Sequence, residues 1–304
     1  MPEPKKIIID TDPGVDDAMA ILYAVHDPAI TLLGLTTVFG NVPVEKATRN
    51  ALRLCDLAGL DIPVAEGAAA PSVVPRLDPA EAARIHGVEG FGPVPPVRPK
   101  RRKIGEDAAD FLARMARAYP GEVTVCAIGP ITNVAEALRR HPDFATNVSQ
   151  IVVMGGAVHV PGNVTSHAEA NTYQDPHALA EVLTSGVSTT IIGLDVTLKV
   201  LADRADFAAL AARHPEHGAF LHAASRDYIS LYEGRGRSGC ALHDPVAVIA
   251  SVAPDLITIQ EMPLTVVLEG EEIGRTRPGQ GPMTRVGVSV DAEATKERFF
   301  STFR

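Results

Sequence analysis

Residues 7–18 of this 304-residue chain read Ile7-Ile8-Ile9-Asp10-Thr11-Asp12-Pro13-Gly14-Val15-Asp16-Asp17-Ala18. The run Lys5–Asp10 is short, apolar and ends in polar residues, which is typical of a buried parallel strand. Apolar side chains then recur at helical spacing over Asp16–His26. A strand that leads directly into a helix predicts the start of an α/β fold.

The same alternation continues along the chain. We expect further strands at Ile30–Phe39, Glu122–Ile128, Ser149–Met154 and Val187–Leu194, and further helices at Val44–Ala58, Gly105–Ala118, Ile131–Arg140 and Pro176–Thr184. Repeated strand-then-helix units predict an open, mostly parallel central sheet with helices on both faces, a Rossmann-like α/β fold. We expect a single domain over residues 1–304.

Two segments interrupt the alternation, and we expect flap-like loops at about residues 70–104 and 232–242. Ala70–Pro99 is rich in proline and glycine, and Tyr232–Leu242 carries three glycines. Long irregular loops in a compact α/β domain usually serve a function. Because strands continue after each segment, we interpret both as flanks of a site and not as domain linkers.

Composition and charge narrow the partners and the compartment. The formal net charge of -9 repels nucleic acid and anionic membranes, so we expect neither as a partner. The basic run Pro99–Lys103 is interpreted as a solvated patch. Three cysteines are too few for a disulfide framework, and the apolar run at the N-terminus is too short for a signal peptide or a membrane span. These features favour the cytoplasm.

The acidic cluster after the first predicted strand is the strongest functional signal. Four aspartates, Asp10, Asp12, Asp16 and Asp17, lie within eight residues at the carboxyl end of a strand, where open α/β sheets bind ligands. Helix capping explains one of them. Two carboxylates ~4 Å apart repel by ~4 kcal/mol at an effective dielectric constant of 20, and a hard divalent cation removes that repulsion. The oxygen ligands favour calcium or magnesium.

A second acidic piece follows the glycine-rich loop as His243-Asp244-Pro245, at the start of a helical run. Asp244 either caps that helix or completes the metal site, and the residues alone leave both interpretations open.

Six motifs, in order, resemble those of the inosine-uridine type nucleoside hydrolases. They are Asp10–Ala18, Thr36–Asn41, Ile128–Asn133, Met154–Gly156, Asn163 with Glu169–Asn171, and His243–Pro245. The resemblance runs from about Lys5 to Val290. It implies hydrolysis of the N-glycosidic bond of a ribonucleoside to ribose and free nucleobase, by attack of a water bound to calcium.

The resemblance also implies roles for residues. One Ca²⁺ per chain is implied, held by Asp12, Asp17, Asp244 and the main-chain carbonyl of Ile128, with Asp12 also the general base. Ribose hydroxyls would be held by Asp16, Asn41 and Asn171, and the 5′-hydroxyl end would be surrounded by Met154, Asn163 and Glu169. His243 would face the nucleobase, with His86 near it. Because His243 adjoins Asp244, we expect it either to protonate the departing base or to cap the following helix and pack against the glycine-rich loop. A homotetramer or homodimer is implied by the same analogy.

Several of these residues also have plainer interpretations. Met154 suits a hydrophobic core, Asn41 and Asn171 suit turns, and His86 suits an exposed loop. Tyr228 and Tyr232 lie at helical spacing and either contact the base or pack within a helix. The base preference stays open, although the absence of tryptophan disfavours a purine site built on tryptophan stacking.

Two other function classes compete. A phosphatase of the haloacid dehalogenase type also starts with a strand and Asp-x-Asp, but Gly14 stands where that motif normally has Thr or Val, and Asp16-Asp17 would be unexplained. A calcium-dependent ribose receptor would share the metal site but would not need His243 or a general base.

Overall fold

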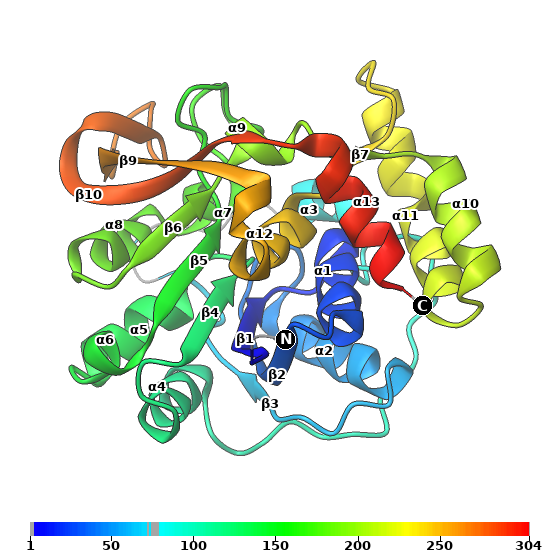
Figure 1. The fold of residues 1–304 in the computed structure, drawn as a ribbon, viewed down its shortest axis with the longest axis horizontal. Helices are drawn as coiled ribbons and strands as arrows, with labels where there is room; N and C mark the ends of the chain where they lie inside the picture. Colours follow the sequence, from blue (N-terminus) through cyan, green and yellow to red (C-terminus); the bar gives the residue numbers. More distant parts are fainter. Residues whose placement is uncertain (1–2, 72, 74–78, 304) are drawn as a thin grey trace.

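A central sheet organises the computed structural model, which describes residues 3–71, 73 and 79–303. Within these residues the sheet has eight strands in the order β3-β2-β1-β4-β5-β6-β10-β9 (Figure 1). All neighbouring pairs are parallel except β9 and β10. This confirms the predicted α/β fold class. The strands are β1 (Lys5–Thr11), β2 (Ile30–Thr37), β3 (Val64–Glu66), β4 (Val123–Ala127), β5 (Gln150–Met154), β6 (Thr189–Ile192), β9 (Ile257–Val266) and β10 (Thr276–Val290).

Helices cover both faces of the sheet, as the sequence predicts (Figure 1). Ile7 and Ile9 of β1 point into the hydrophobic cluster under α1, α2 and α12, whereas Ile8 points into the cluster under α4, α5 and α8. All three are fully buried, which is why β1 is apolar throughout. The helices are α1 (Val15–His26), α2 (Val44–Leu57), α3 (Pro79–His86), α4 (Ala108–Ala118), α5 (Thr132–Arg140), α6 (Phe144–Asn147), α7 (Ala170–Gln174), α8 (Pro176–Thr184), α9 (Leu194–Thr197), α10 (Arg204–Arg213), α11 (His217–Glu233), α12 (His243–Val252) and α13 (Ala292–Thr302).

The strand order reverses direction between β1 and β4. From β1 the chain passes to β2 and β3 on one side, and then returns to β4, β5 and β6 on the other. In open α/β sheets such a reversal opens a crevice at the carboxyl ends of the two central strands, where ligands bind. The acidic cluster follows β1 directly, so the topology places it at this crevice.

Several elements differ from the sequence-based expectations. The segment expected to be an irregular flap contains α3, an alanine-rich stretch of good helix formers, while residues 72 and 74–78 of that segment lie outside the described residues. Tyr232 belongs to α11 and not to the following loop. The pair α10 and α11, the strand β3 and the antiparallel hairpin of β9 and β10 were not predicted, and a two-residue antiparallel pair joins β7 (Leu201–Ala202) to β8 (Cys240–Ala241).

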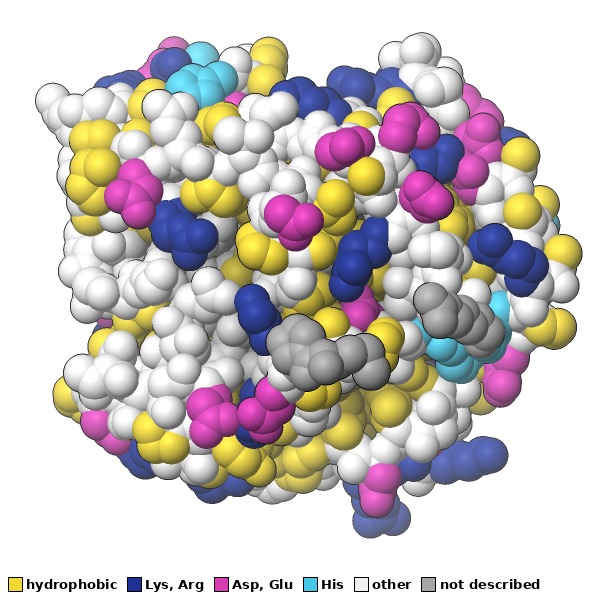
Figure 2. All heavy atoms as spheres, viewed as in Figure 1, with side chains coloured by type: hydrophobic (Ala, Val, Ile, Leu, Met, Phe, Trp, Pro, Cys, Tyr) yellow, Lys and Arg dark blue, Asp and Glu magenta, His cyan; other side chains and the backbone are white. Residues whose placement is uncertain are grey.

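The surface carries mixed charge. On the face shown in Figure 2, acidic and basic side chains are interspersed and do not gather into one basic area. Within the part of the chain that the structure describes, no helix is both long and apolar enough to cross a membrane.

Candidate active site

Asp12 lies directly after β1 and is fully buried. Its Oδ2 accepts a hydrogen bond of 2.5 Å from the main-chain N–H of Asn41. Its Oδ1 has no hydrogen-bond partner in the described part of the chain. Two glycines make room for the carboxylate, because a Cβ at Gly129 would lie 2.6 Å from Oδ1 and a Cβ at Gly40 would overlap Oδ2. The backbones of the loops after β2 and β4 therefore approach Asp12 closely at these two glycines.

Asp17 is oriented by the start of α1. Its carboxylate accepts hydrogen bonds from Thr11 Oγ1 at 2.5 Å, from the Gly14 N–H at 2.9 Å and from the Asn41 Nδ2 at 3.0 Å. The Gly14 bond satisfies a main-chain donor that the first turn of a helix leaves free. Asp17 thus has a fixed orientation, and Asn41 ties it to Asp12 across the crevice.

Asp16, Asp17 and Asp244 form a tight acidic triplet. One carboxylate oxygen from each lies within 4.8 Å of the others, and all three residues are buried. Asp16 Oδ1 and Asp244 Oδ2 have no hydrogen-bond partner within the described residues. Burial raises the pKa of Asp16 to about 6. Burial, followed by repulsion from Asp16 and Asp17, holds the pKa of Asp244 well above its ordinary value.

The donor set fits a hard divalent cation. Unpartnered oxygens of Asp12, Asp16 and Asp244 are buried in the same crevice, and burial followed by repulsion from Asp17 raises the pKa of Asp12 well above its usual range. The carbonyl of Ile128 accepts from Asn171 Nδ2 at 2.9 Å, which leaves its second lone pair available. Crowded oxygen ligands of this kind match calcium or magnesium. Asp12 is not one of the three residues, Asp16, Asp17 and Asp244, whose carboxylate oxygens lie within 4.8 Å of one another.

His243 belongs to a chain of hydrogen bonds that reaches Asp16. Its Nδ1 lies 2.8 Å from Thr197 Oγ1 and its Nε2 lies 2.7 Å from the Tyr232 hydroxyl. The Tyr232 and Tyr228 hydroxyls are 3.5 Å apart, and Tyr228 donates to Asp16 Oδ2 at 3.2 Å. Burial lowers the pKa of His243 to about 4, so the ring is neutral at pH 7 in the free protein. Both tyrosines therefore face the site and do more than pack α11.

His86, at the end of α3, is buried and not exposed. The Val15 N–H donates to its Nδ1 at 3.2 Å, which leaves the proton of the neutral ring on Nε2. The same Nδ1 lies 3.7 Å from Asp16 Oδ1, and the ring packs 5.6 Å from that of Tyr228. Burial lowers the pKa of His86 to about 4. The segment expected to be a flap thus delivers this histidine to the acidic cluster.

A second group of site residues lies around α7. The buried carboxylate of Glu169 caps this helix, accepting from the N–H groups of Asn171, Thr172 and Gly156 at 2.9, 3.0 and 3.1 Å. Asn171 Nδ2 also donates to the Met154 carbonyl at 3.1 Å, beside the buried Met154 side chain. Asn163 is exposed, and its Oδ1 accepts from the Ala170 N–H at 3.0 Å. The residues expected at the site lie at the carboxyl ends of the strands, in the loops that follow them, or on α1, α3, α7, α11 and α12.

Three further residues, to which the sequence analysis gave no individual role, brace the site. Asp10 Oδ1 accepts from Thr36 Oγ1 at 2.6 Å and from Asn133 Nδ2 at 2.7 Å, which ties β1 to β2 and to α5. Burial raises the pKa of Asp10 to about 7. These three residues lie inside the quoted motifs. Their polar side chains, at or just after the ends of strands, were the feature of the sequence from which a role could have been predicted. Thr197, which holds His243, carries no such signal.

Comparison with known proteins identifies the family. The model of the inosine-uridine preferring nucleoside hydrolases matches residues 7–297. This chain belongs to that family. It is 43% identical to uridine nucleosidase 1 of Arabidopsis thaliana, over 91% of this chain and 82% of that protein. It is 36% identical to the non-specific ribonucleoside hydrolase RihC of Salmonella agona, over 96% and 95%.

Solved structures agree. The purine-preferring ribonucleoside hydrolase of Gardnerella vaginalis superposes with a TM-score of 0.94 at 35% identity, covering 98% of both chains. A plant nucleoside hydrolase superposes with a TM-score of 0.93 at 36% identity, covering 99% of both chains. The chain is an N-ribosyl hydrolase, which cleaves ribonucleosides to base and ribose, so the resemblance is confirmed and the phosphatase and receptor alternatives fall away.

The space around Asp12 yields a prediction for this nucleoside hydrolase. Gly129→Ala places a methyl group 2.6 Å from Asp12 Oδ1, so the carboxylate must move. We expect kcat/KM for ribonucleoside hydrolysis to fall by ~10²-fold, since displacements on the order of 1 Å at an active site cost about that much. Gly105→Ala, which meets open space, is the matched control. Equal activity of the two variants would show that the Asp12 position is not critical.

Proposed function

We propose that this nucleoside hydrolase is calcium-dependent, and that Asp12 activates the attacking water. The observation that carries the proposal is the set of buried carboxylate oxygens without partners at the end of β1, contributed by Asp12, Asp16 and Asp244. Buried carboxylates repel one another strongly unless a cation lies among them. The oxygen-only donor set favours Ca²⁺, one per chain, over a transition metal.

We assign the ion to Asp12, Asp17, Asp244 and the carbonyl of Ile128. When bound there, a divalent cation makes a water molecule more acidic and gives substrate hydroxyls a point of attachment. Asp17 is held in place by Thr11 and Gly14, so its carboxylate needs little rearrangement to serve as a ligand. Asp244 reaches the same point from α12, which joins the two halves of the chain at the site.

Asp12 acts as the general base. Its Oδ2 is fixed by the Asn41 N–H, while its buried Oδ1 stays free to take a proton. Cleavage of the glycosidic bond builds positive charge on the ribosyl ring, and the surrounding carboxylates stabilise that charge. The site thus supplies both the base for the water and the electrostatic stabilisation of the transition state.

The polar residues around the proposed ion would recognise the hydroxyl groups of the ribose. Asp16, Asn41 and Asn171 would hold ribose hydroxyls. The Asn171 amide donates both hydrogens to main-chain carbonyls of Ile128 and Met154, so its oxygen is the group left to accept from a hydroxyl. Met154, Asn163 and Glu169 would surround the 5′-hydroxyl.

The nucleobase would meet His243, Tyr228, Tyr232 and His86. Negative charge that develops on the departing base raises the proton affinity of its surroundings, which favours a proton on His243 even though burial keeps the free ring neutral. We propose uridine among the substrates, because the relative with 43% identity is named a uridine nucleosidase. A homodimer or homotetramer and a cytoplasmic location remain part of this proposal.

Metal content gives the direct test. We expect purified wild-type protein to hold one Ca²⁺ per chain and to lose hydrolysis in excess chelator. Asp244→Asn removes one charge from the triplet and should weaken Ca²⁺ binding by at least ~10-fold. Asp61→Asn, at an exposed position, serves as the control. A protein that holds no divalent ion and is fully active in chelator would contradict the proposal.

The stabilisation of the protein by Ca²⁺ should depend on pH. The folded pKa of Asp16, about 6, lies above its ordinary value of about 3.9, so the metal-free fold favours the protonated group. That stability is fully present below about pH 4 and is lost as the pH rises through 6. Asp16 lies within 4.8 Å of the proposed ligands Asp17 and Asp244, so Ca²⁺ binds more tightly when Asp16 is deprotonated and negatively charged. The increase in Tm on adding Ca²⁺ should therefore be larger at pH 7.5 than at pH 5, and an equal increase would argue against carboxylate ligands.

The general base is tested by Asp12→Asn, which keeps the shape and an oxygen ligand but cannot accept a proton. We expect kcat to fall by ~10²–10⁴-fold. Ion analysis of the variant separates the two roles, since the base role predicts the loss even when Ca²⁺ is retained. A calcium-loaded variant with nearly normal kcat would mean that another group activates the water.

The role of His243 is tested with two leaving groups. His243→Ala should lose ~10²-fold or more on uridine or inosine, whose bases leave poorly without a proton. It should lose much less on p-nitrophenyl riboside, whose leaving group needs none. Equal losses on both substrates in a folded, calcium-loaded variant would assign His243 a structural role and direct attention to Tyr228, Tyr232 and His86.

A further inference from the structure

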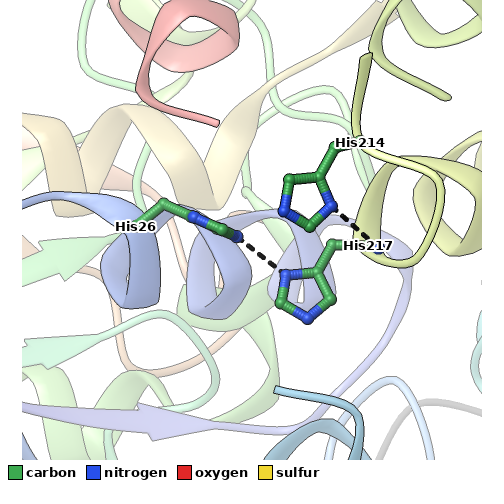
Figure 3. Close-up of side chains that lie close together, drawn as sticks. All are labelled: His26, His214 and His217. Carbon is green, nitrogen blue, oxygen red and sulfur yellow. Dashed lines mark hydrogen bonds between the residues drawn. The ribbon is translucent and has the colours of Figure 1, made fainter. Parts of the chain in front are cut away.

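Three histidines converge at the opposite end of α1 from the active site (Figure 3). His26 is the last residue of α1, His214 caps the C-terminus of α10, and His217 is the first residue of α11. One ring nitrogen from each lies within 4.8 Å of the others. His217 is buried, and His26 and His214 are partly exposed, so the cluster is anchored in the protein and open to solvent on one side.

Hydrogen bonds define the proton positions in the cluster. His217 Nε2 lies 3.2 Å from the Leu57 carbonyl, which can only accept, so this nitrogen carries the proton and Nδ1 holds a lone pair. That lone pair points at His26 Nε2, 2.7 Å away. A histidine that donates one N–H to a backbone carbonyl and directs its other nitrogen at a shared point has the arrangement of a metal ligand.

The rings are in the protonation state that metal binding requires. Burial, followed by repulsion from the other two histidines, lowers the pKa of His26 to about 4. Burial also lowers the pKa of His217, against a smaller opposite effect of the hydrogen bond to the Leu57 carbonyl. Both shifts favour the neutral imidazole, which can bind a cation without first losing a proton from a charged ring.

The backbone is built for this convergence. A Cβ at Gly218 would lie 2.5 Å from the Leu210 carbonyl, so the close approach of α10 and α11 requires glycine there. The carboxyl ends of α1 and α10 both point at the cluster, and their dipoles favour a cation, although the amino end of α11 opposes them. The His214 and His217 rings are stacked at 4.7 Å, which holds them in place.

We propose that His26, His214 and His217 bind a transition-metal ion of the zinc class, at a site separate from the catalytic one. Imidazole nitrogens suit Zn²⁺, Ni²⁺ or Cu²⁺ and not calcium. The ion takes the place of the proton between His26 and His217, and that proton shifts from Nε2 to Nδ1 of the neutral His26 ring. The two ligating nitrogens move from 2.7 Å to ~3.3 Å apart for Zn–N bonds of ~2.0 Å. The bond from the His217 N–H to His214 Nδ1, already long at 3.3 Å, lengthens further. Water completes the shell on the exposed side.

Such an ion would connect the end of α1 to the α10–α11 pair, so its effect is on stability. With the full chain kept in excess Ca²⁺ to occupy the acidic site, we expect Zn²⁺ titration calorimetry to give one Zn²⁺ per chain. We expect saturating Zn²⁺ to raise the Tm by on the order of 5 °C. X-ray absorption of the zinc-loaded protein should show three imidazole nitrogens.

Two variants from different elements decide the assignment. His26→Gln and His214→Gln should each weaken Zn²⁺ binding by at least ~10-fold and abolish the rise in Tm, whereas His222→Gln, exposed on α11, should behave as wild type. Uridine hydrolysis with Ca²⁺ checks that each variant is folded, so a folding failure in one leaves the other to decide. Absence of zinc binding by the wild type in excess Ca²⁺, or unchanged zinc binding in the folded variant, would overturn the proposal.

Discussion

Carboxylates that repel one another are buried together at the end of β1, and the surrounding strands, loops and helices hold them there. Asp12, Asp16, Asp17 and Asp244 are withdrawn from water, and burial raises the pKa of each. Such a cluster is tolerable only if donors and a cation compensate it. The donors are present as Thr11, the Gly14 N–H and both nitrogens of Asn41. The carboxylate oxygens of Asp12, Asp16 and Asp244 that have no hydrogen-bond partner within the described residues are the ones available to an ion.

The architecture follows from the need to bring these groups to one point. The reversal of strand order between β1 and β4 brings the loops after β1, β2 and β4 together, and glycines at 40 and 129 let their backbones close on Asp12. Asp10 stabilises this arrangement, because its hydrogen bonds to Thr36 and Asn133 join β1 to β2 and to α5. The helices α11 and α12 then deliver the tyrosines, His243 and Asp244 from far along the chain.

Those parts of the fold and of the site that depend on residues close together in the sequence could be predicted from it. The isoleucines of β1 alternate between two hydrophobic clusters, so a fully apolar strand and its following helix were readable from the sequence. The proximity of Asp12 and Asp17 is likewise local. The approach of Tyr228 to Asp16, 212 positions away, is not, and neither is the bond from Thr197 to His243. Helix α3 was not predicted, because the prolines and glycines on either side of it indicated a loop more strongly than its alanines indicated a helix. The histidine cluster was not predicted because its members come from two distant segments of the chain.

Helix α1 joins two sites of opposite chemical character. Its first turn holds the oxygen-rich cluster at Asp16 and Asp17, and its last residue, His26, belongs to the nitrogen-rich one. Ten residues of helix separate Asp16 from His26 by ~15 Å, where two unit charges interact by ~1 kcal/mol at an effective dielectric constant of 20. Charge at one end therefore has only a small direct effect on ion binding at the other. Selectivity must come from the ligands themselves, since hard calcium prefers carboxylates and a zinc-class ion prefers imidazole. In our proposal the same rigid helix connects an ion that serves chemistry to one that serves stability.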